Sequence, residues 1–294
     1  MTTEDPDELS SIDSILEQTL KDIGIPPRPV ILDRISAEMD KDDPNFRQVG
    51  HLIDADVSLA ASFIKTANSP YFGFRSRARS ANEALMMLGL NVSSRAIAGI
   101  SLRKAFPVGL SLERFWNASA QIAALSGWLT QIVRKGNLRA DDAYTFGLFR
   151  DCGIPVMLRR FPNYEQILVR ANDDARRQFT QVEQQGLPEF PTDHAMVGHL
   201  LAQNWFLPEE ICLAIRHHHE LPALDLIESG LPESSRYLIA TGQTAEHILQ
   251  QLTGSSHTRE WAKLGASCLR LLGLTEDKLA SLYPEAAEVL KTVE

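Results

Sequence analysis

The residues of this sequence that could do chemistry are a small set of histidines and acids in its second half. Residues 217–219 are three consecutive histidines, His194 lies upstream of them, and Asp151 directly follows Arg150. Imidazole and carboxylate groups are common protein ligands of first-row transition metals. Consecutive residues of a helix point about 100° apart, so we expect the three histidines not to face one pocket together. At least one of them should lie on the surface.

Each of these groups also has a purely structural interpretation. Asp151 beside Arg150 fits a partly buried ion pair or a helix-end cap better than a metal ligand. His194 stands near a predicted helix start. Its side chain is equally compatible with hydrogen bonding at the helix end and with a role in a site. Asp151 with one or two histidines falls short of the three or more protein ligands of a tight catalytic site. The sequence therefore predicts no bound metal and no other cofactor.

A second candidate is the arginine-rich segment of residues 72–79. The segment begins with two aromatic residues, and after them arginines alternate with small residues. This pattern would suit contact with an anion or a nucleic acid. A solvated loop is the simpler interpretation. Asn68 stands at a predicted helix end, where capping is favoured over ligand contact. The candidate anion or partner contacts are Asn68, Arg75, Arg77 and Arg79.

Composition and charge narrow the class of protein. The 294 residues are 44% hydrophobic and 23% charged, which predicts an ordered chain with a substantial core. A net charge of −9 gives no general attraction to phosphate backbones and counts against nucleic acid as a partner. The apolar runs are shorter than the roughly 20 residues of a membrane span, so no membrane association is expected. Three scattered cysteines and an acidic N-terminus predict a cytoplasmic protein.

Apolar residues recur at helical spacing along most of the chain, and no stretch alternates as a strand would. Asp56 is the predicted N-cap of one helix. Ser80 is the predicted N-cap of the next, where it forms a capping box with Glu83, and Gly89 is expected to end that helix. Further helices are predicted from Ser111 to Gly136, after a cap at Thr192, after Pro208, and over about residues 233–251, 258–272 and 275–292. The fold class is an all-α bundle of about thirteen to fifteen helices. Glu183, Trp116 and Trp205 are interpreted as structural.

A set of motifs in a fixed order resembles a known family. The motifs are Val49 to Gly73 with Ile53, Asp56, Leu59, Ala60, Asn68, Ser69 and Tyr71, then Ala84 to Gly89, Phe115-Trp116 with Ser119, Gly147 to Gly153, His194-Ala195 with Gly198, and Trp205, Leu207-Pro208 and His217-His218. Over about residues 25–221 this order resembles the HDOD family, a divergent branch of the HD phosphohydrolase superfamily. Val57 replaces a usual proline. The resemblance implies an HD-like helical domain with a small N-terminal helical subdomain.

The resemblance also implies where an HD hydrolase would hold its metal. Such enzymes use His and Asp side chains from several helices to bind one or two metal ions, which activate water. The first ligand histidine corresponds to Ala118, which has no donor atom. The histidine of the His-Asp pair corresponds to Arg150, a permanent cation. Asp151 is retained, and the final aspartate falls near Gln243. The degenerate HD-type site implied by the family comprises Ala118, Arg150, Asp151, His194, His217, His218 and Gln243.

Arg150 has two interpretations at this position. It could pair with Asp151 or a nearby acid and lock the bundle, or its rigid fork of donors could meet an anionic ligand. We favour the lock, because no glycine-rich phosphate cradle lies nearby in the sequence.

Three regions are expected. Residues 1–24 form an acidic segment with a helix, residues 25–221 form the HDOD-like domain (subdomains of about 25–106 and 110–221), and residues 222–294 form a C-terminal helical extension packed on its core. The resemblance implies a non-enzymatic bacterial signalling or regulatory module that binds a protein partner or a small anionic ligand through the degenerate site. A homo-oligomer is compatible with the sequence. The alternative is a metal-dependent phosphohydrolase acting on a nucleotide or cyclic dinucleotide, which Ala118 and Arg150 oppose.

Overall fold

The computed structural model describes residues 21–69, 72–74, 76–106, 110–225, 230–254 and 257–293. These residues form sixteen helices and no strand, which confirms the all-α class with slightly more helices than expected. The helices are α2 (Val30–Met39), α3 (Phe46–Asp54), α4 (Val57–Ala67), α5 (Ala81–Ala105), α6 (Leu110–Val133), α7 (Ala140–Phe149), α8 (Gly153–Arg160), α9 (Tyr164–Asp173), α10 (Phe179–Gly186), α11 (His194–Asn204), α12 (Glu209–His217), α13 (Leu221–Asp225), α14 (Glu233–Thr253), α15 (Glu260–Leu272), α16 (Glu276–Ser281) and α17 (Tyr283–Lys291). Residues 1–20 of the predicted N-terminal acidic segment and the candidate contact Arg75 lie outside the described residues.

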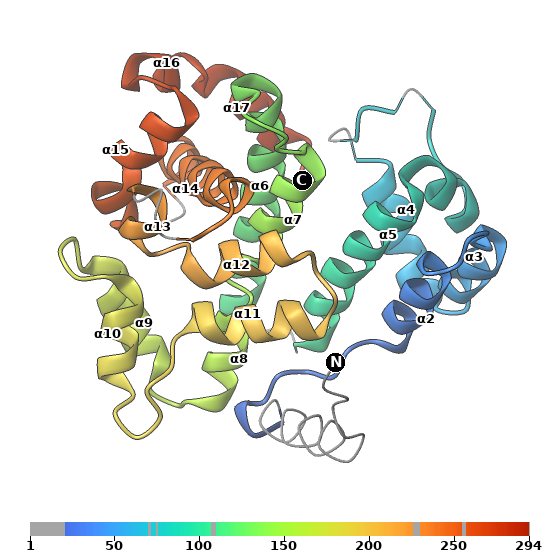
Figure 1. Ribbon diagram of the computed structural model, residues 1–294, viewed down its shortest axis with the longest axis horizontal. Coiled ribbons are helices and arrows are strands. Elements are labelled where there is room, and N and C mark those ends of the chain that lie inside the picture. Colours follow the sequence, from blue (N-terminus) through green and yellow to red (C-terminus); the bar gives the residue numbers. More distant parts are fainter. Residues whose placement is uncertain are drawn as a thin grey trace, which may run out of the picture.

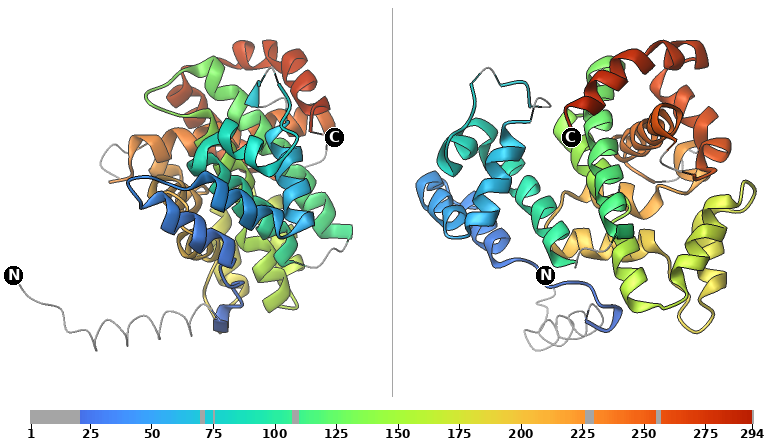
Figure 2. Two further views of the ribbon diagram at one scale, coloured as in Figure 1. Left: turned by 90° about the vertical axis from the view of Figure 1, so that its right-hand side faces the viewer. Right: turned by 180° about the vertical axis from the view of Figure 1, so that it is seen from behind.

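The helices form two lobes joined by α5. Helices α2 to α4 pack around α5 in the smaller lobe, and helices α6 to α17 form the larger one (Figure 1). The far end of α5 reaches across to pack on α7, so one helix belongs to both lobes (Figure 2). The smaller lobe is the N-terminal helical subdomain that the family resemblance implied.

Local sequence signals set the helix starts in the smaller lobe. The carboxylate of Asp56 accepts from the backbone N–H of Leu59, and the Ser80 hydroxyl accepts from that of Glu83, as predicted. Gly89 does not end its helix. It adopts φ 74°, which glycine tolerates without a Cβ clash, and the chain resumes helical geometry beyond it. Helix α5 is therefore kinked where a stop was predicted.

Helix α5 is longer and more apolar than the sequence-based expectation allowed. Within the described part of the chain it alone is long and apolar enough to cross a membrane by length and composition, with a mean hydropathy of 1.4 over its best window. The sequence-based expectation that every apolar run is too short overlooked it. Its Leu85, Ile97 and Leu102 are fully buried in the main core. We attribute its apolar character to this packing.

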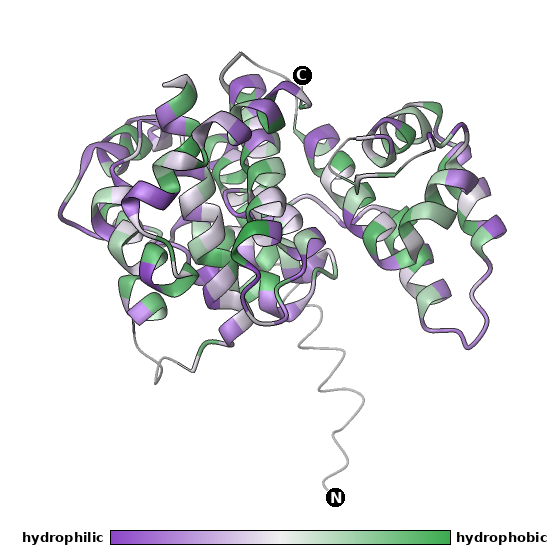
Figure 3. Ribbon diagram, turned by 90° about the horizontal axis from the view of Figure 1, so that it is seen from above, coloured by the Kyte–Doolittle hydropathy of each residue, from purple (hydrophilic) through white to green (hydrophobic). Residues whose placement is uncertain are grey.

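Within the larger lobe, the segment from residue 230 onward packs on the helices that precede it in the chain. Helix α14 lies against α6, α7, α12 and α15, and α17 packs on α6. Figure 3 shows hydrophobic and hydrophilic residues mixed along the helices. Their apolar residues form a second core of Ile122, Leu125, Leu129, Ile248, Leu249, Leu279, Leu282 and Leu290. Trp116 and Trp205 are buried in the main core, as predicted for structural indoles.

Candidate functional site

Three helix ends bring the candidate site together. Asp151 lies in the turn between α7 and α8, His194 is the first residue of α11, and His218 and His219 directly follow α12. One donor atom from each of these four residues lies within 4.8 Å of all the others. We refer to Asp151, His194, His218 and His219 as the four-donor cluster.

The start of α11 positions His194. The carboxylate of Asp193 accepts from the backbone N–H of Met196 at 2.8 Å and so caps the helix. The predicted cap, Thr192, lies one residue before the observed one. The glycine of α8 that faces this helix end, Gly153, allows a close approach: a Cβ there would lie 2.0 Å from the His194 carbonyl oxygen. Backbone contact between α8 and α11 therefore holds His194 beside Asp151.

The Nε2 atom of His194 is at the middle of the cluster. It lies 3.3 Å from Nε2 of His218 and 3.2 Å from Nε2 of His219. Oδ1 of Asp151 lies 3.5 Å from Nε2 of His194 and 3.3 Å from Nε2 of His218. Four groups rich in lone pairs at these separations require protons or a cation between them.

The outward nitrogens of the three imidazoles are all engaged. Each Nδ1 lies within hydrogen-bond distance of an oxygen, so Nδ1 carries the proton and Nε2 faces the cluster. The acceptors are the carboxylate of Glu183 for His194 at 2.8 Å, the Ile215 carbonyl for His218 at 2.7 Å, and the carboxylate of Glu260 for His219 at 2.7 Å. Glu183, which the sequence analysis treated as structural, thus orients a site residue.

The histidine triplet divides differently from the expectation. The side chain of His217 turns away, is about one-third exposed, and pairs with Glu220 at 2.9 Å. His219 was not among the predicted site residues, yet it belongs to the cluster. His218 and His219 can share the cluster because α12 ends at His217 and both lie in the turn beyond it. The expectation that at least one of the three points elsewhere was correct.

Arg150 closes the other side of Asp151. Its guanidinium is 3% exposed and donates from Nε to Asp151 at 2.9 Å and from Nη2 to Glu246 at 2.7 Å. Its Nη1 donates to the Gly242 carbonyl at 3.3 Å. This is the geometry that the lock interpretation requires.

The remaining positions of the implied HD site contribute little to the cluster. Ala118 packs against the second core. Gln243 is buried, and its amide donates to the backbone carbonyl of His218 at 3.1 Å. The acid of α14 that reaches the site is Glu246, one helical turn beyond the predicted position. Neither Glu246 nor Glu260 could be found from a motif, because both lie in the segment that matches none.

The buried charges shift one another's protonation. Burial lowers the pKa of His194, but Glu183 and Asp151 outweigh it and raise that pKa to about 10. Burial would raise the pKa of Asp151, but Arg150 and the histidines hold it well below its ordinary value. Burial and the two neighbouring histidines lower the pKa of His219. Without a metal, the cluster therefore consists of an imidazolium at His194, a carboxylate at Asp151 and a neutral His219.

The donor set fits a metal ion. Tetrahedral zinc has bonds of about 2.0–2.1 Å to nitrogen and oxygen, which places neighbouring ligand atoms about 3.3–3.4 Å apart. Four of the six separations in the cluster, at 3.2–3.5 Å, match this spacing, and all six lie within 4.8 Å. Asp151, His194, His218 and His219 would hold the ion, which would cross-link three helix ends. The sequence-based count of too few ligands was therefore wrong, because it left out His219.

The arginine-rich segment does not form one patch. The amide of Asn68 donates to the Ala78 carbonyl at 2.9 Å and accepts from the Ala78 N–H at 2.7 Å, so it braces the loop after α4. Arg79 engages Glu83 through its backbone N–H. Of the described arginines of this segment, Arg77 lines a cleft between the lobes.

The helical fold and the His-Asp cluster define an HD-type protein. Residues 25–221 match the HDOD domain family, and the chain belongs to it. An uncharacterized protein of Treponema pallidum is 26% identical over 235 residues, which cover 79% of this chain and 43% of that protein. The chain thus spans less than half the length of this relative.

Solved structures share the fold. An HDOD domain protein of unknown function from Geobacter sulfurreducens superposes with a TM-score of 0.64 at 24% identity, covering 95% of this chain and 96% of that one. A candidate signal transduction protein from Marinobacter aquaeolei superposes with a TM-score of 0.66 at 20% identity, covering 94% of this chain and 59% of that one. At these identities the likeness concerns the fold alone.

Proposed function

We propose that this protein is a non-enzymatic bacterial signal-transduction module that responds to a protein partner or a small ligand in the cytoplasm. The observation that carries the proposal is the position of Arg150. A permanent cation occupies the place where the family pattern implies a metal-binding histidine, and two carboxylates hold it there. The three buried free cysteines agree with a reducing compartment.

The four-donor cluster supports a structural role better than a catalytic one. A catalytic zinc site has three protein ligands and leaves a position open for water or substrate, whereas a structural site is closed by four. Here four protein donors surround the centre, and the side chain of His194 is fully buried. A metal ion in this cluster would supply cohesion between helix ends.

The same burial bears on where a ligand would bind. The sequence-based expectation placed recognition at the degenerate site itself. Arg150 and His194 are buried there, and opening the site would separate several ion pairs. We therefore place recognition on the surface or between the lobes, with the cluster as the rigid core of the module.

A metal-dependent phosphohydrolase is the second candidate, and the fit of the cluster to a metal favours it. It would need at least one open coordination position beside Asp151.

Turnover separates the two proposals. Purified protein would be incubated with bis(p-nitrophenyl) phosphate and with cyclic dinucleotides in the presence of Mn²⁺, Fe²⁺ or Zn²⁺. We expect no product above the protein-free background. Metal-dependent turnover that disappears in Asp151→Ala would overturn the non-enzymatic proposal.

A further inference from the structure

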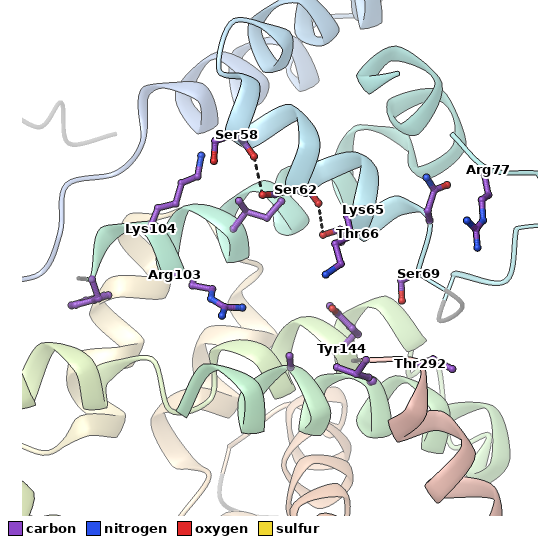
Figure 4. Close-up of a pocket in the computed structure, with 16 residues that line it drawn as sticks. Ser58, Ser62, Lys65, Thr66, Ser69, Arg77, Arg103, Lys104, Tyr144 and Thr292 are labelled. Atoms are coloured by element: carbon purple, nitrogen blue, oxygen red, sulfur yellow. Dashed lines mark hydrogen bonds between the residues drawn. The ribbon is translucent and has the colours of Figure 1, made fainter. Parts of the chain in front are cut away.

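A cleft of about 910 Å³ lies between the two lobes, apart from the four-donor cluster. Helix α4, the connection after it and the end of α5 form one wall. Helices α6 and α7 and residues Thr292 and Val293 form the other (Figure 4). The volume falls within the range of about 300–1,000 Å³ typical of small-molecule sites.

The charge of this cleft runs against that of the whole protein. Lys65, Arg77, Arg103 and Lys104 line it, and its lining includes no aspartate or glutamate, although the chain carries a net charge of −9. Such a concentration of one sign in a concave site attracts and holds ions of the opposite sign.

Three of the four cations are available to a ligand. Lys104 pairs with Asp56 at 3.2 Å. Among the described residues, Lys65, Arg77 and Arg103 make no ion pair. Figure 4 shows Lys65 and Arg103 extending into the cleft from α4 and α5. The three cations therefore line one cleft without a counter-ion among the described residues, with Arg77 on the connection after α4.

The facing wall has a different character. Ala120 and Ala124 of α6 present small side chains, and Tyr144 of α7 lies between the lobes beneath Lys65 (Figure 4). Small side chains next to an aromatic ring leave room for a planar ring system to stack. The hydroxyls of Ser62 and Thr66 already donate to carbonyls of their own helix, so the cations are the main donors of the cleft.

We propose that this cleft binds a nucleotide with two or more phosphate groups, its phosphates held by Lys65, Arg77 and Arg103 and its base against the Tyr144 wall. The inference rests on the proposed function, because a module without turnover needs a ligand site outside its closed centre. A nucleotide in the cleft contacts both lobes. It therefore fixes their relative orientation about α5, which carries the kink at Gly89.

Binding would be measured by isothermal titration calorimetry at low salt with ATP, inorganic pyrophosphate, orthophosphate, adenosine and a short DNA duplex. The variants are Lys65→Ala and Arg103→Ala, with Arg103→Gln as a milder replacement. Lys278→Ala is the matched control, because Lys278 is an exposed lysine of α16 outside the cleft. The replaced side chains are exposed, so circular dichroism of the variants should match the wild type.

We expect ATP to bind more tightly than pyrophosphate, and both more tightly than orthophosphate or adenosine. Each cleft variant should weaken ATP binding by about tenfold or more, the effect of losing a charge-assisted hydrogen bond. Lys278→Ala should leave it unchanged.

Three results would overturn the proposal: no ATP binding, equal binding by the cleft variants, or duplex DNA that binds more tightly than ATP and loses its affinity in the same variants. A different result would show that the proposed non-enzymatic function is wrong. ATP binding accompanied by Asp151-dependent hydrolysis would refute the non-enzymatic module while leaving the cleft as a nucleotide site.

Discussion

Nη2 of Arg150 lies 2.7 Å from a carboxylate oxygen of Glu246, a residue 96 positions further along the chain. This pair ties the end of α7 to the middle of α14. It joins the region that matches the HDOD family to the segment beyond it, so the C-terminal helices complete the centre as well as covering it.

The four-donor cluster should bind one Zn²⁺ ion per chain. Elemental analysis after zinc loading and dialysis should give one equivalent, and zinc should raise the melting temperature because it binds the folded state. His219→Ala and Asp151→Asn should each lose the ion. His217→Ala is the matched control and should keep it, because His217 pairs with Glu220 outside the cluster. Retention of zinc by His219→Ala would contradict the assignment.

The metal-free protein should lose stability at alkaline pH. The pKa of His194 is raised from 6.5 to about 10 in the fold, so its charged form stabilises the folded state. This contribution is complete below pH 6.5 and is lost as the pH rises through about 10. Melting temperatures across this range should fall, and His194→Gln should remove most of the slope. An identical slope in the variant would show that another group titrates.

The fold class could be predicted from sequence because its signals are local. Asp56 and Ser80 cap the helices they were expected to cap, since a capping residue acts within four positions of itself. The site was predicted only in part. Side chains of consecutive residues point about 100° apart only inside a helix. His219 lies just beyond the end of α12, so this rule does not apply to it. Glu246 and Glu260 reach the cluster through long-range packing, which no local pattern encodes.

Gly153→Ala should destabilise the protein. The added methyl group would lie 2.0 Å from the carbonyl oxygen of His194 and 2.8 Å from the backbone nitrogen of Gly198, so α8 and α11 would have to separate. Overpacking of this kind costs about 1–3 kcal/mol. Chemical denaturation measures the loss, and zinc affinity should fall in the same variant because His194 moves relative to Asp151. Unchanged stability and affinity would show that the two helices are not in close contact.

The measurement that tests the central claim most directly is the free energy of unfolding of Arg150→Ala. If Arg150 locks the centre, its removal leaves the buried Glu246 and the half-buried Asp151 without this partner, at a cost of about 3–5 kcal/mol. Arg95→Ala is the matched control, because Arg95 also pairs with two carboxylates, Asp141 and Asp142, but at a more exposed position. It should cost about 1 kcal/mol or less. An Arg150→Ala protein as stable as the wild type would contradict the lock and assign Arg150 to binding an anionic ligand.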